Sequence, residues 1–139
     1  MKISAKIDYA CRALLELSLH WPDESPLQIH EIAHRQKIPI KFLVHILIHL
    51  KQLDYLKSIR GKKGGYVLTR NPREIKLSEV MKSFGGLGLT QKEEKRPSSE
   101  HIMDNIWQQI DKKIFAAVEE INFETICLRV QNRAPMYEI

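Results

Sequence analysis

A glycine-rich basic stretch at residues 58–70, SIRGKKGGYVLTR, constrains the fold more than any other part of the chain. It joins two short runs of strand-forming residues, 55–59 and 66–69. Its three glycines permit the tight chain reversal of a β-hairpin. A nucleotide-phosphate loop is disfavoured, because the Lys-Ser/Thr ending of such loops is missing and a strand follows where a helix would be needed. The pattern therefore predicts a hairpin with a cationic tip.

The residues before this hairpin have helical periodicity. Apolar side chains recur at steps of three and four over 4–19, 29–36 and 39–53, which predicts three helices. The last two are separated by a few residues only, and the small Ala33 allows a close helix crossing, which is typical of a helix-turn-helix. Lys37 stands where a glycine often eases the turn. An ordinary helical hairpin is the alternative, but a β-hairpin directly after the two helices favours a winged helix-turn-helix.

The second half of the chain has a different pattern. A short helix is expected over 78–84, a mobile loop over 86–98, and from residue 99 onward a long helix with a continuous apolar seam. Because the apolar surface is wider than one stripe, this helix is expected to pack both on its own domain and on a second subunit. Residues 122–131 are expected to return to the body of the protein. The predicted dimer contacts are Met103, Trp107, Ile110, Ile114 and Val118.

The predicted fold class is mainly α with a small β-hairpin. It consists of a winged helix-turn-helix domain over 1–85, the mobile loop over 86–98, and a dimerisation helix with a C-terminal segment over 99–139.

Charge is divided unevenly between the two parts. The net charge of +5 consists of +7 over residues 1–85 and −2 over residues 86–139. A cationic first part favours a polyanionic partner, although a solvated basic surface would give the same count. No apolar run is long enough for a membrane span and no signal peptide is evident, so a soluble cytoplasmic protein is expected, with no membrane partner.

The third helix and the hairpin provide the candidate contacts with double-stranded DNA. If Leu43, Ile46, Leu47 and Leu50 face inward, the outer face includes Ile48 and His49, and its N-terminal residues point toward the major groove. The hairpin would place an arginine in the minor groove and lysines on phosphates. Apolar outer positions also allow packing by another protein, so a winged-helix interaction module without a DNA role is an alternative. The predicted DNA-binding residues are Pro39, Ile40, Lys41, Val44, His45, Arg60, Lys62, Lys63, Gly64 and Tyr66.

Catalytic and metal sites have no positive support. Two histidine pairs, His30 with His34 and His45 with His49, have the four-residue spacing that places two imidazoles on one helix face. Neither pair has an evident third ligand, and no catalytic arrangement of nucleophile, base and acid can be assembled. No catalytic residue, no metal site and no cofactor is therefore predicted, and the protein is not expected to be an enzyme.

The sequence resembles the Rrf-type bacterial transcription regulators, the group that includes IscR, NsrR and CymR. The resemblance covers most of the chain, and its most specific string is Ser58-x-Arg60-Gly61-x-x-Gly64-Gly65-Tyr66-x-Leu68, supported by Glu31-Ile32-Ala33 and Phe42-Leu43. It implies a winged helix-turn-helix, a long dimerising helix, and binding of a homodimer to a partly palindromic operator. The function expected for this chain is that of a dimeric DNA-binding regulator that represses transcription. Many relatives have serines at the positions of Pro39 and Lys41 and a Glu-Gln pair at Val44-His45, so the operator of those relatives is not carried over to this chain.

A second departure from the family concerns its sensor. Cluster-binding members have three cysteines in the loop before the long helix, whereas residues 86–99 contain none. No iron-sulfur cluster is therefore predicted. Cys11 and Cys127 are expected to be free thiols. The alternatives for the input signal are a small-molecule or protein effector, and a redox or metal response through Cys11 or the histidines.

Overall fold

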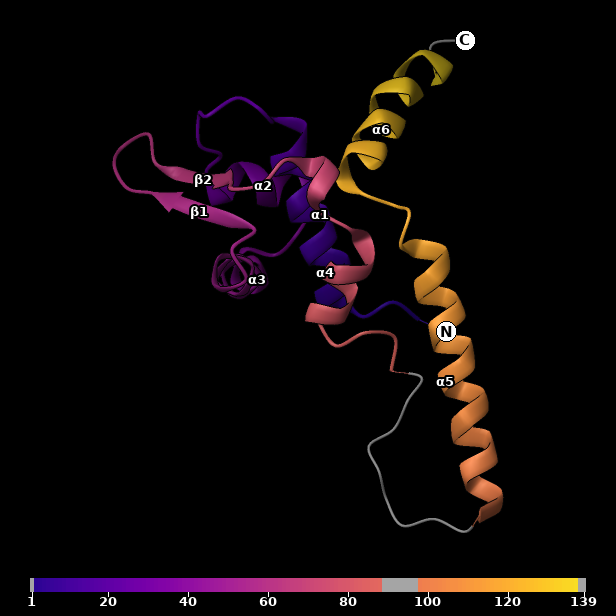
Figure 1. Ribbon diagram of the computed structural model, residues 1–139. Helices are drawn as coiled ribbons and strands as arrows, with labels where there is room; N and C mark the ends of the chain where they lie inside the picture. Colours follow the sequence, from indigo (N-terminus) through magenta and orange to yellow (C-terminus); the bar gives the residue numbers. More distant parts are fainter. Residues whose placement is uncertain (1, 89–97, 138–139) are drawn as a thin grey trace.

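A computed structural model describes residues 2–88 and 98–137. The described chain forms a helical body that carries a projecting two-stranded hairpin, with a long helix standing along one side (Figure 1). This confirms the fold class expected from the sequence. The elements are α1 (Ala5–Leu19), α2 (Ile29–Gln36), α3 (Ile40–Gln52), β1 (Leu56–Ile59), β2 (Gly65–Leu68), the 3₁₀ turn η1 (Pro72–Glu74), α4 (Leu77–Ser83), α5 (Ser98–Val118) and α6 (Phe123–Tyr137).

Short-range interactions set the helix ends. Ser4 caps α1, because its hydroxyl accepts a hydrogen bond from the Ile7 amide at 3.3 Å. Lys37 ends α2 in the left-handed conformation, with φ 53° and ψ 47°. The Ile38 amide then donates to the Ala33 carbonyl at 3.0 Å, and both side chains are buried in the crossing between α2 and α3. The helix-turn-helix geometry predicted from Ala33 is present.

The wing contains a third extended segment that the sequence does not predict. β1 and β2 pair antiparallel, with Leu56 opposite Leu68 and Ile59 opposite Gly65. Leu27 forms a further antiparallel bridge with Tyr66, through amide-to-carbonyl hydrogen bonds of 3.0 and 2.8 Å. Leu27 precedes α2, so this bridge ties the hairpin to the first half of the domain.

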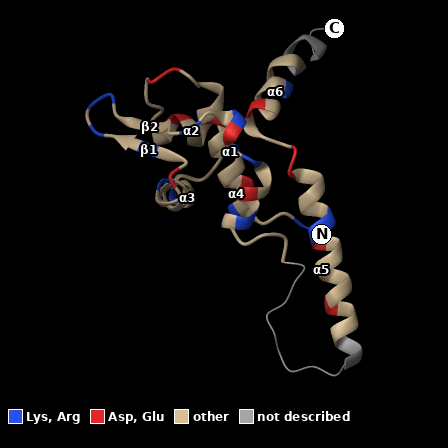
Figure 2. Ribbon diagram, in the orientation of Figure 1, with Lys and Arg blue, Asp and Glu red and all other residues tan. Residues whose placement is uncertain are grey.

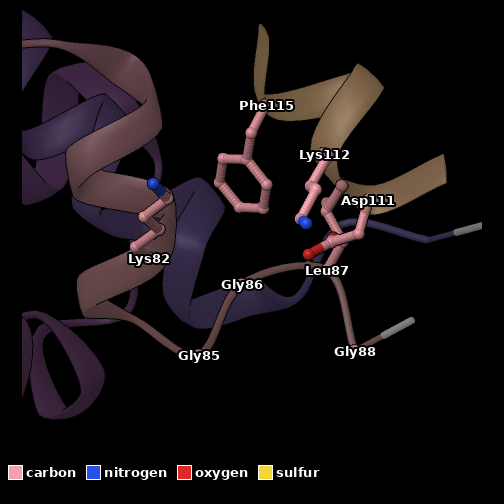
Figure 3. Close-up of a pocket in the computed structure, with 8 residues that line it drawn as sticks. All are labelled: Lys82, Gly85, Gly86, Leu87, Gly88, Asp111, Lys112 and Phe115. Atoms are coloured by element: carbon pink, nitrogen blue, oxygen red, sulfur yellow. The ribbon is translucent and has the colours of Figure 1, made fainter. Parts of the chain in front are cut away.

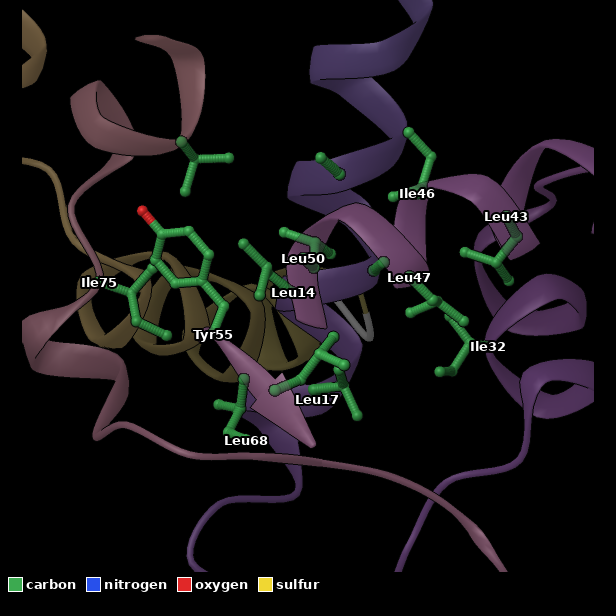
Figure 4. Packing of buried hydrophobic residues seen from close by; sticks show 14 of the residues in the cluster. Leu14, Leu17, Ile32, Leu43, Ile46, Leu47, Leu50, Tyr55, Leu68 and Ile75 are labelled. Atoms are coloured by element: carbon green, nitrogen blue, oxygen red, sulfur yellow. The ribbon is translucent and has the colours of Figure 1, made fainter. Parts of the chain in front are cut away.

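A single hydrophobic core lies between α1, α2, α3 and the base of the hairpin. Leucine and isoleucine side chains from all of these elements interdigitate there (Figure 4). The periodicity of residues 39–53 correctly predicts the inner face of α3. Fully buried members of the core include Leu14, Ile32, Leu43, Leu47, Leu50 and Ile75.

The C-terminal segment returns to this core, as expected for residues 122–131. The Leu77 amide donates to the Ile121 carbonyl at 2.9 Å, and the Phe123 amide donates to the Ile75 carbonyl at 3.1 Å. The ring of Phe123 is completely buried. From this anchor α6 runs against α1 and η1, while α5 touches the body chiefly at α4.

Two expectations fall partly outside the described chain. Most of the loop expected over 86–98 lies at residues 89–97, which are not described, so its mobility stays a prediction. The domain division at residue 85 also stays a prediction. In the parts that the structure covers, every helix is too short or too polar to cross a membrane.

Candidate nucleic-acid interface

The outer face of α3 is unusually apolar for a helix surface. Ile40 is 42% exposed, Val44 38% and Ile48 49%, while Lys41 and His45 are also exposed. These residues project outward because the inner face of the same helix is occupied by the core leucines. The expected outer positions are therefore available to a partner. Pro39 precedes them as the exposed N-cap residue of α3.

His49 is the exception to the predicted outer face. It is only half-exposed, and its ring centroid lies 4.4 Å from that of Phe84 at the end of α4. His49 therefore lies at the edge of the outer face, where Phe84 contacts its ring.

Phe42 adds an aromatic surface that the sequence reasoning missed. Its ring is 48% exposed and lies 6.3 Å from the Tyr9 ring of α1, in a stacked arrangement. The ammonium group of Lys41 lies 5.1 Å from the centre of the same ring, within the range of a cation–π contact. One signal was available: Phe42 is one position from the buried Leu43, and one residue turns a helix by about 100°.

The hairpin tip is built by glycine and carries three exposed cations. The Gly64 amide donates to the Gly61 carbonyl at 3.0 Å, and a Cβ on Gly64 would lie only 2.2 Å from the Ile59 carbonyl oxygen. No other residue fits that position without moving the strand. Figure 2 shows the resulting blue tip, far from the helical body. The exposed cations are Arg60, Lys62 and Lys63.

The wing is fixed to α3 by polar contacts at its base. The Lys51 ammonium donates to the Ser58 hydroxyl at 2.8 Å, and the Arg70 guanidinium donates to the Leu53 carbonyl at 3.1 Å. The backbone of Tyr66 pairs with Leu27, and its half-buried side chain leaves part of its surface accessible. The base of the hairpin is therefore joined to the C-terminal end of α3.

The predicted dimer residues separate into two groups. Met103, Trp107 and Ile110 are exposed on α5, and neighbouring Ile102 and Ile106 are exposed as well, with values between 38% and 62% for the five side chains. They lie within an arc of about 140° at the usual 100° per residue. Ile114 is half-buried, and Val118 packs partly against the core of its own chain.

The two cysteines are poorly suited to thiolate chemistry. Burial, followed by the nearby Asp8 carboxylate, raises the pKa of the Cys11 thiol to about 12. Burial, then Glu124 and Glu16, raises the pKa of Cys127. Within residues 2–88 and 98–137, no three His, Cys, Asp or Glu side chains gather into a group that could hold a metal ion.

A helix-turn-helix joined to a cationic wing defines the class, a DNA-binding fold of transcription regulators. The Rrf2 family profile, described as iron-dependent transcriptional regulator, matches residues 3–129. The chain belongs to the Rrf2 family.

Curated relatives agree with this assignment. The rrf2-like regulator of Rhodobacter capsulatus is 43% identical over 86 residues, which are 60% of this chain and 57% of that protein. The alignment thus spans little more than half of that relative. The HTH-type transcriptional regulator slr0846 of Synechocystis is 30% identical over 128 residues, 87% of this chain and 84% of that protein. The family and these relatives are transcription regulators, so the chain is a regulator and not an enzyme.

Solved structures share the fold. The structure of T. potens IscR matches with a TM-score of 0.77 at 26% identity, covering 94% of this chain and 88% of that one. CymR, the global cysteine regulator of B. subtilis, matches with a TM-score of 0.69 at 23% identity, covering 91% and 96%. At that identity CymR supports the fold alone.

The iron in the family description does not fit the residues of this chain. Iron-sulfur clusters are held chiefly by cysteine thiolates. This sequence has two cysteines, one in α1 and one in α6, and burial keeps both thiols protonated. A cluster held by three cysteines of one chain cannot form.

Proposed function

We propose that the protein acts as a homodimeric repressor that binds a partly palindromic DNA operator. The observation that carries this proposal is that the cationic hairpin directly follows α3 and packs against it, with the Lys51–Ser58 hydrogen bond across the junction. A recognition helix in the major groove with a wing along the adjacent backbone needs such a fixed relation.

Within this proposal each part of the surface has a separate role. Lys41 reads guanine or contacts a phosphate, and Ile40 and Val44 contact thymine methyl groups. His45 lies beside them toward the same groove. Arg60 enters the minor groove, where A·T-rich segments concentrate negative potential.

Alongside the recognition helix, the hairpin contacts the DNA backbone, and these contacts do not depend on the DNA sequence. Lys62 and Lys63 pair with phosphates. Gly64 allows the close approach of the wing backbone, and the accessible part of Tyr66 faces the same duplex. Pro39 fixes the entry to the recognition helix.

The exposed stripe on α5 supports the dimer. Ile102, Met103, Ile106, Trp107 and Ile110 form a contiguous apolar surface, and such a surface on a helix is typical of a protein–protein contact. A symmetric pair of these helices would present two recognition helices to the two halves of a palindrome. Ile114 and Val118 would lie at the edge of that contact.

The contribution of the wing to DNA binding is tested by titrating a bound genomic fragment with the protein at several salt concentrations. Arg60→Ala is expected to lower specific affinity by about 1–3 kcal/mol, and Lys62→Ala to reduce the salt slope by about one unit, because one phosphate contact is lost. Lys113→Ala on α5 removes the same charge away from the wing and should change neither value. If both wing variants bind like the unaltered protein, the wing is not part of the mechanism.

One observation favours a second candidate, an interaction module that binds a protein in place of DNA. Ile40, Phe42, Val44 and Ile48 are all exposed on one helix. Mixed genomic fragments at two salt concentrations separate the two functions. Salt-sensitive retention with an enriched palindrome supports the repressor, whereas no retention at either concentration supports the module.

A further inference from the structure

A cavity of about 430 Å³ lies where α4, the following glycine turn and α5 meet. Figure 3 shows Lys82 of α4 on one side, the Phe115 ring in the centre, and Asp111 with Lys112 on the other side. The backbone of residues 85–88 closes the cavity from below. Neither the DNA-contact surface nor the exposed stripe of α5 uses these side chains.

The glycine turn keeps this cavity open. Gly85 and Gly86 have φ values of 103° and 65°, and the Gly86 amide donates to the Met81 carbonyl at 2.8 Å, which ends α4. A Cβ on Gly86 would lie 3.9 Å from the Phe115 ring, so a longer side chain there would enter the cavity. Glycine therefore provides both the left-handed turn and the free space.

The charged groups around the cavity are complementary to one kind of small molecule. Among the described residues, no ion pair engages Lys82, Asp111 or Lys112. The Lys82 ammonium lies 5.0 Å from the centre of the Phe115 ring. Two ammonium groups can bind a carboxylate, one carboxylate can bind an ammonium, and an aromatic ring offers an apolar wall. A simple dianion would be repelled by Asp111.

We propose that this cavity binds a free amino acid and that its occupancy controls DNA binding. The ligand carboxylate pairs with Lys82 and Lys112, its ammonium group with Asp111, and its side chain packs on Phe115. The regulatory half of this proposal rests on the proposed repressor function, whereas the binding half does not.

Its position between two elements couples the cavity to DNA binding. α4 belongs to the winged-helix body, since Val80 and Met81 are buried in its core. α5 carries the exposed apolar stripe. A ligand that contacts both elements favours one spacing between them, and this spacing sets the distance between the two recognition helices of a dimer.

Binding can be tested without DNA by thermal unfolding of the full chain in the presence of each of the twenty L-amino acids. Calorimetry then measures the affinity of those that raise the Tm. At least one amino acid is expected to bind more than tenfold tighter than the same acid without its amine. Asp111→Asn should abolish that preference, because it removes the partner of the ammonium group. Glu119→Gln removes the same negative charge at an exposed position outside the cavity, so it should leave the binding unchanged.

A second variant fills the cavity. Gly86→Asn tolerates the left-handed backbone and should abolish binding, while an unchanged circular dichroism spectrum shows that the chain is folded. The binding proposal is overturned if no amino acid raises the Tm, or if Asp111→Asn keeps its preference for the amine. Binding that leaves DNA affinity unchanged overturns the regulatory half. Absence of DNA binding both with and without the amino acid would instead count against the proposed repressor function.

Discussion

Lys37 occupies a backbone conformation that side chains generally avoid. Its φ of 53° and ψ of 47° lie in the left-handed region, which costs a residue with a Cβ about 1–2 kcal/mol. Related turns often have glycine at this position. The left-handed conformation of Lys37 lets the Ile38 amide donate to the Ala33 carbonyl, and this hydrogen bond offsets the strain. The energy gained by forming this turn thus outweighs the cost of the left-handed backbone at Lys37.

Replacing Lys37 with glycine should therefore stabilise the protein. Lys37→Gly is expected to raise the free energy of unfolding by about 0.5–1 kcal/mol, since the relief of strain exceeds the greater flexibility of the unfolded chain. Urea unfolding measures this change. Lys37→Ala removes the same charge but keeps the Cβ, so it should give no such gain; equal stabilisation by both would assign the effect to charge.

Val44 provides a residue-level test of base recognition under the proposed function. Its exposed methyl groups suit a thymine methyl, and burial of one such group contributes about 0.8 kcal/mol. Replacing the contacted thymine of a selected operator by deoxyuridine should weaken binding about fourfold. The loss should vanish in Val44→Ala, as measured by competition between the two DNA duplexes. Equal losses in both proteins would show that Val44 does not touch that methyl group.

At the scale of elements, α5 has one face against the protein body and one face that is exposed. Phe115 and Val118 pack toward the protein body, whereas the exposed stripe includes Ile106, Trp107 and Ile110. An apolar stripe left in water is costly, so a second copy of the helix is the expected cover. The continuous pattern of this segment indicates the stripe, but which part of it the body covers depends on how far α5 extends past α4.

Under the proposed function, Trp107→Glu should convert the expected dimer to a monomer. A carboxylate buried in an apolar contact would lack a partner, and its desolvation opposes association. Sedimentation velocity at micromolar concentration measures the change in mass. Gln108→Glu introduces the same charge outside the stripe and should remain dimeric. A Trp107→Glu protein that sediments as a dimer would place the contact elsewhere.

At the scale of the whole molecule, Phe123 joins the two ends of the chain. It is fully buried in the same core as Leu14 and Ile75, and its amide bonds to the Ile75 carbonyl. α6 is therefore connected to the winged-helix body by packing as well as by the backbone. One cooperative unfolding transition is expected.

Removing this ring should destabilise the entire fold. Phe123→Ala is expected to lower the free energy of unfolding by about 3–5 kcal/mol, and the milder Phe123→Leu by less. Urea titration followed by both circular dichroism and Trp fluorescence measures the loss. The exposed Leu128 offers a control, since Leu128→Ala should cost under about 0.5 kcal/mol. Two separate transitions in the unaltered protein would contradict this coupling.

The sequence by itself determined the features that short-range physics controls. Helical periodicity identified the inner face of α3, and the glycines of 58–70 predicted the hairpin, because backbone sterics and side-chain spacing act within a few residues. The same periodicity indicated the apolar seam of α5. The glycine of the family motif in the wing is also set by a neighbouring residue, because any side chain at Gly64 would clash with the Ile59 carbonyl oxygen.

Only the tertiary structure decided which distant segments meet. The bridge between Leu27 and Tyr66, the contact between His49 and Phe84, and the burial of Phe123 all join residues far apart in the chain. The cavity under Phe115 likewise exists because α5 passes α4 at the glycine turn. Such contacts follow from how complete elements pack against each other, and no local pattern of residues encodes that choice.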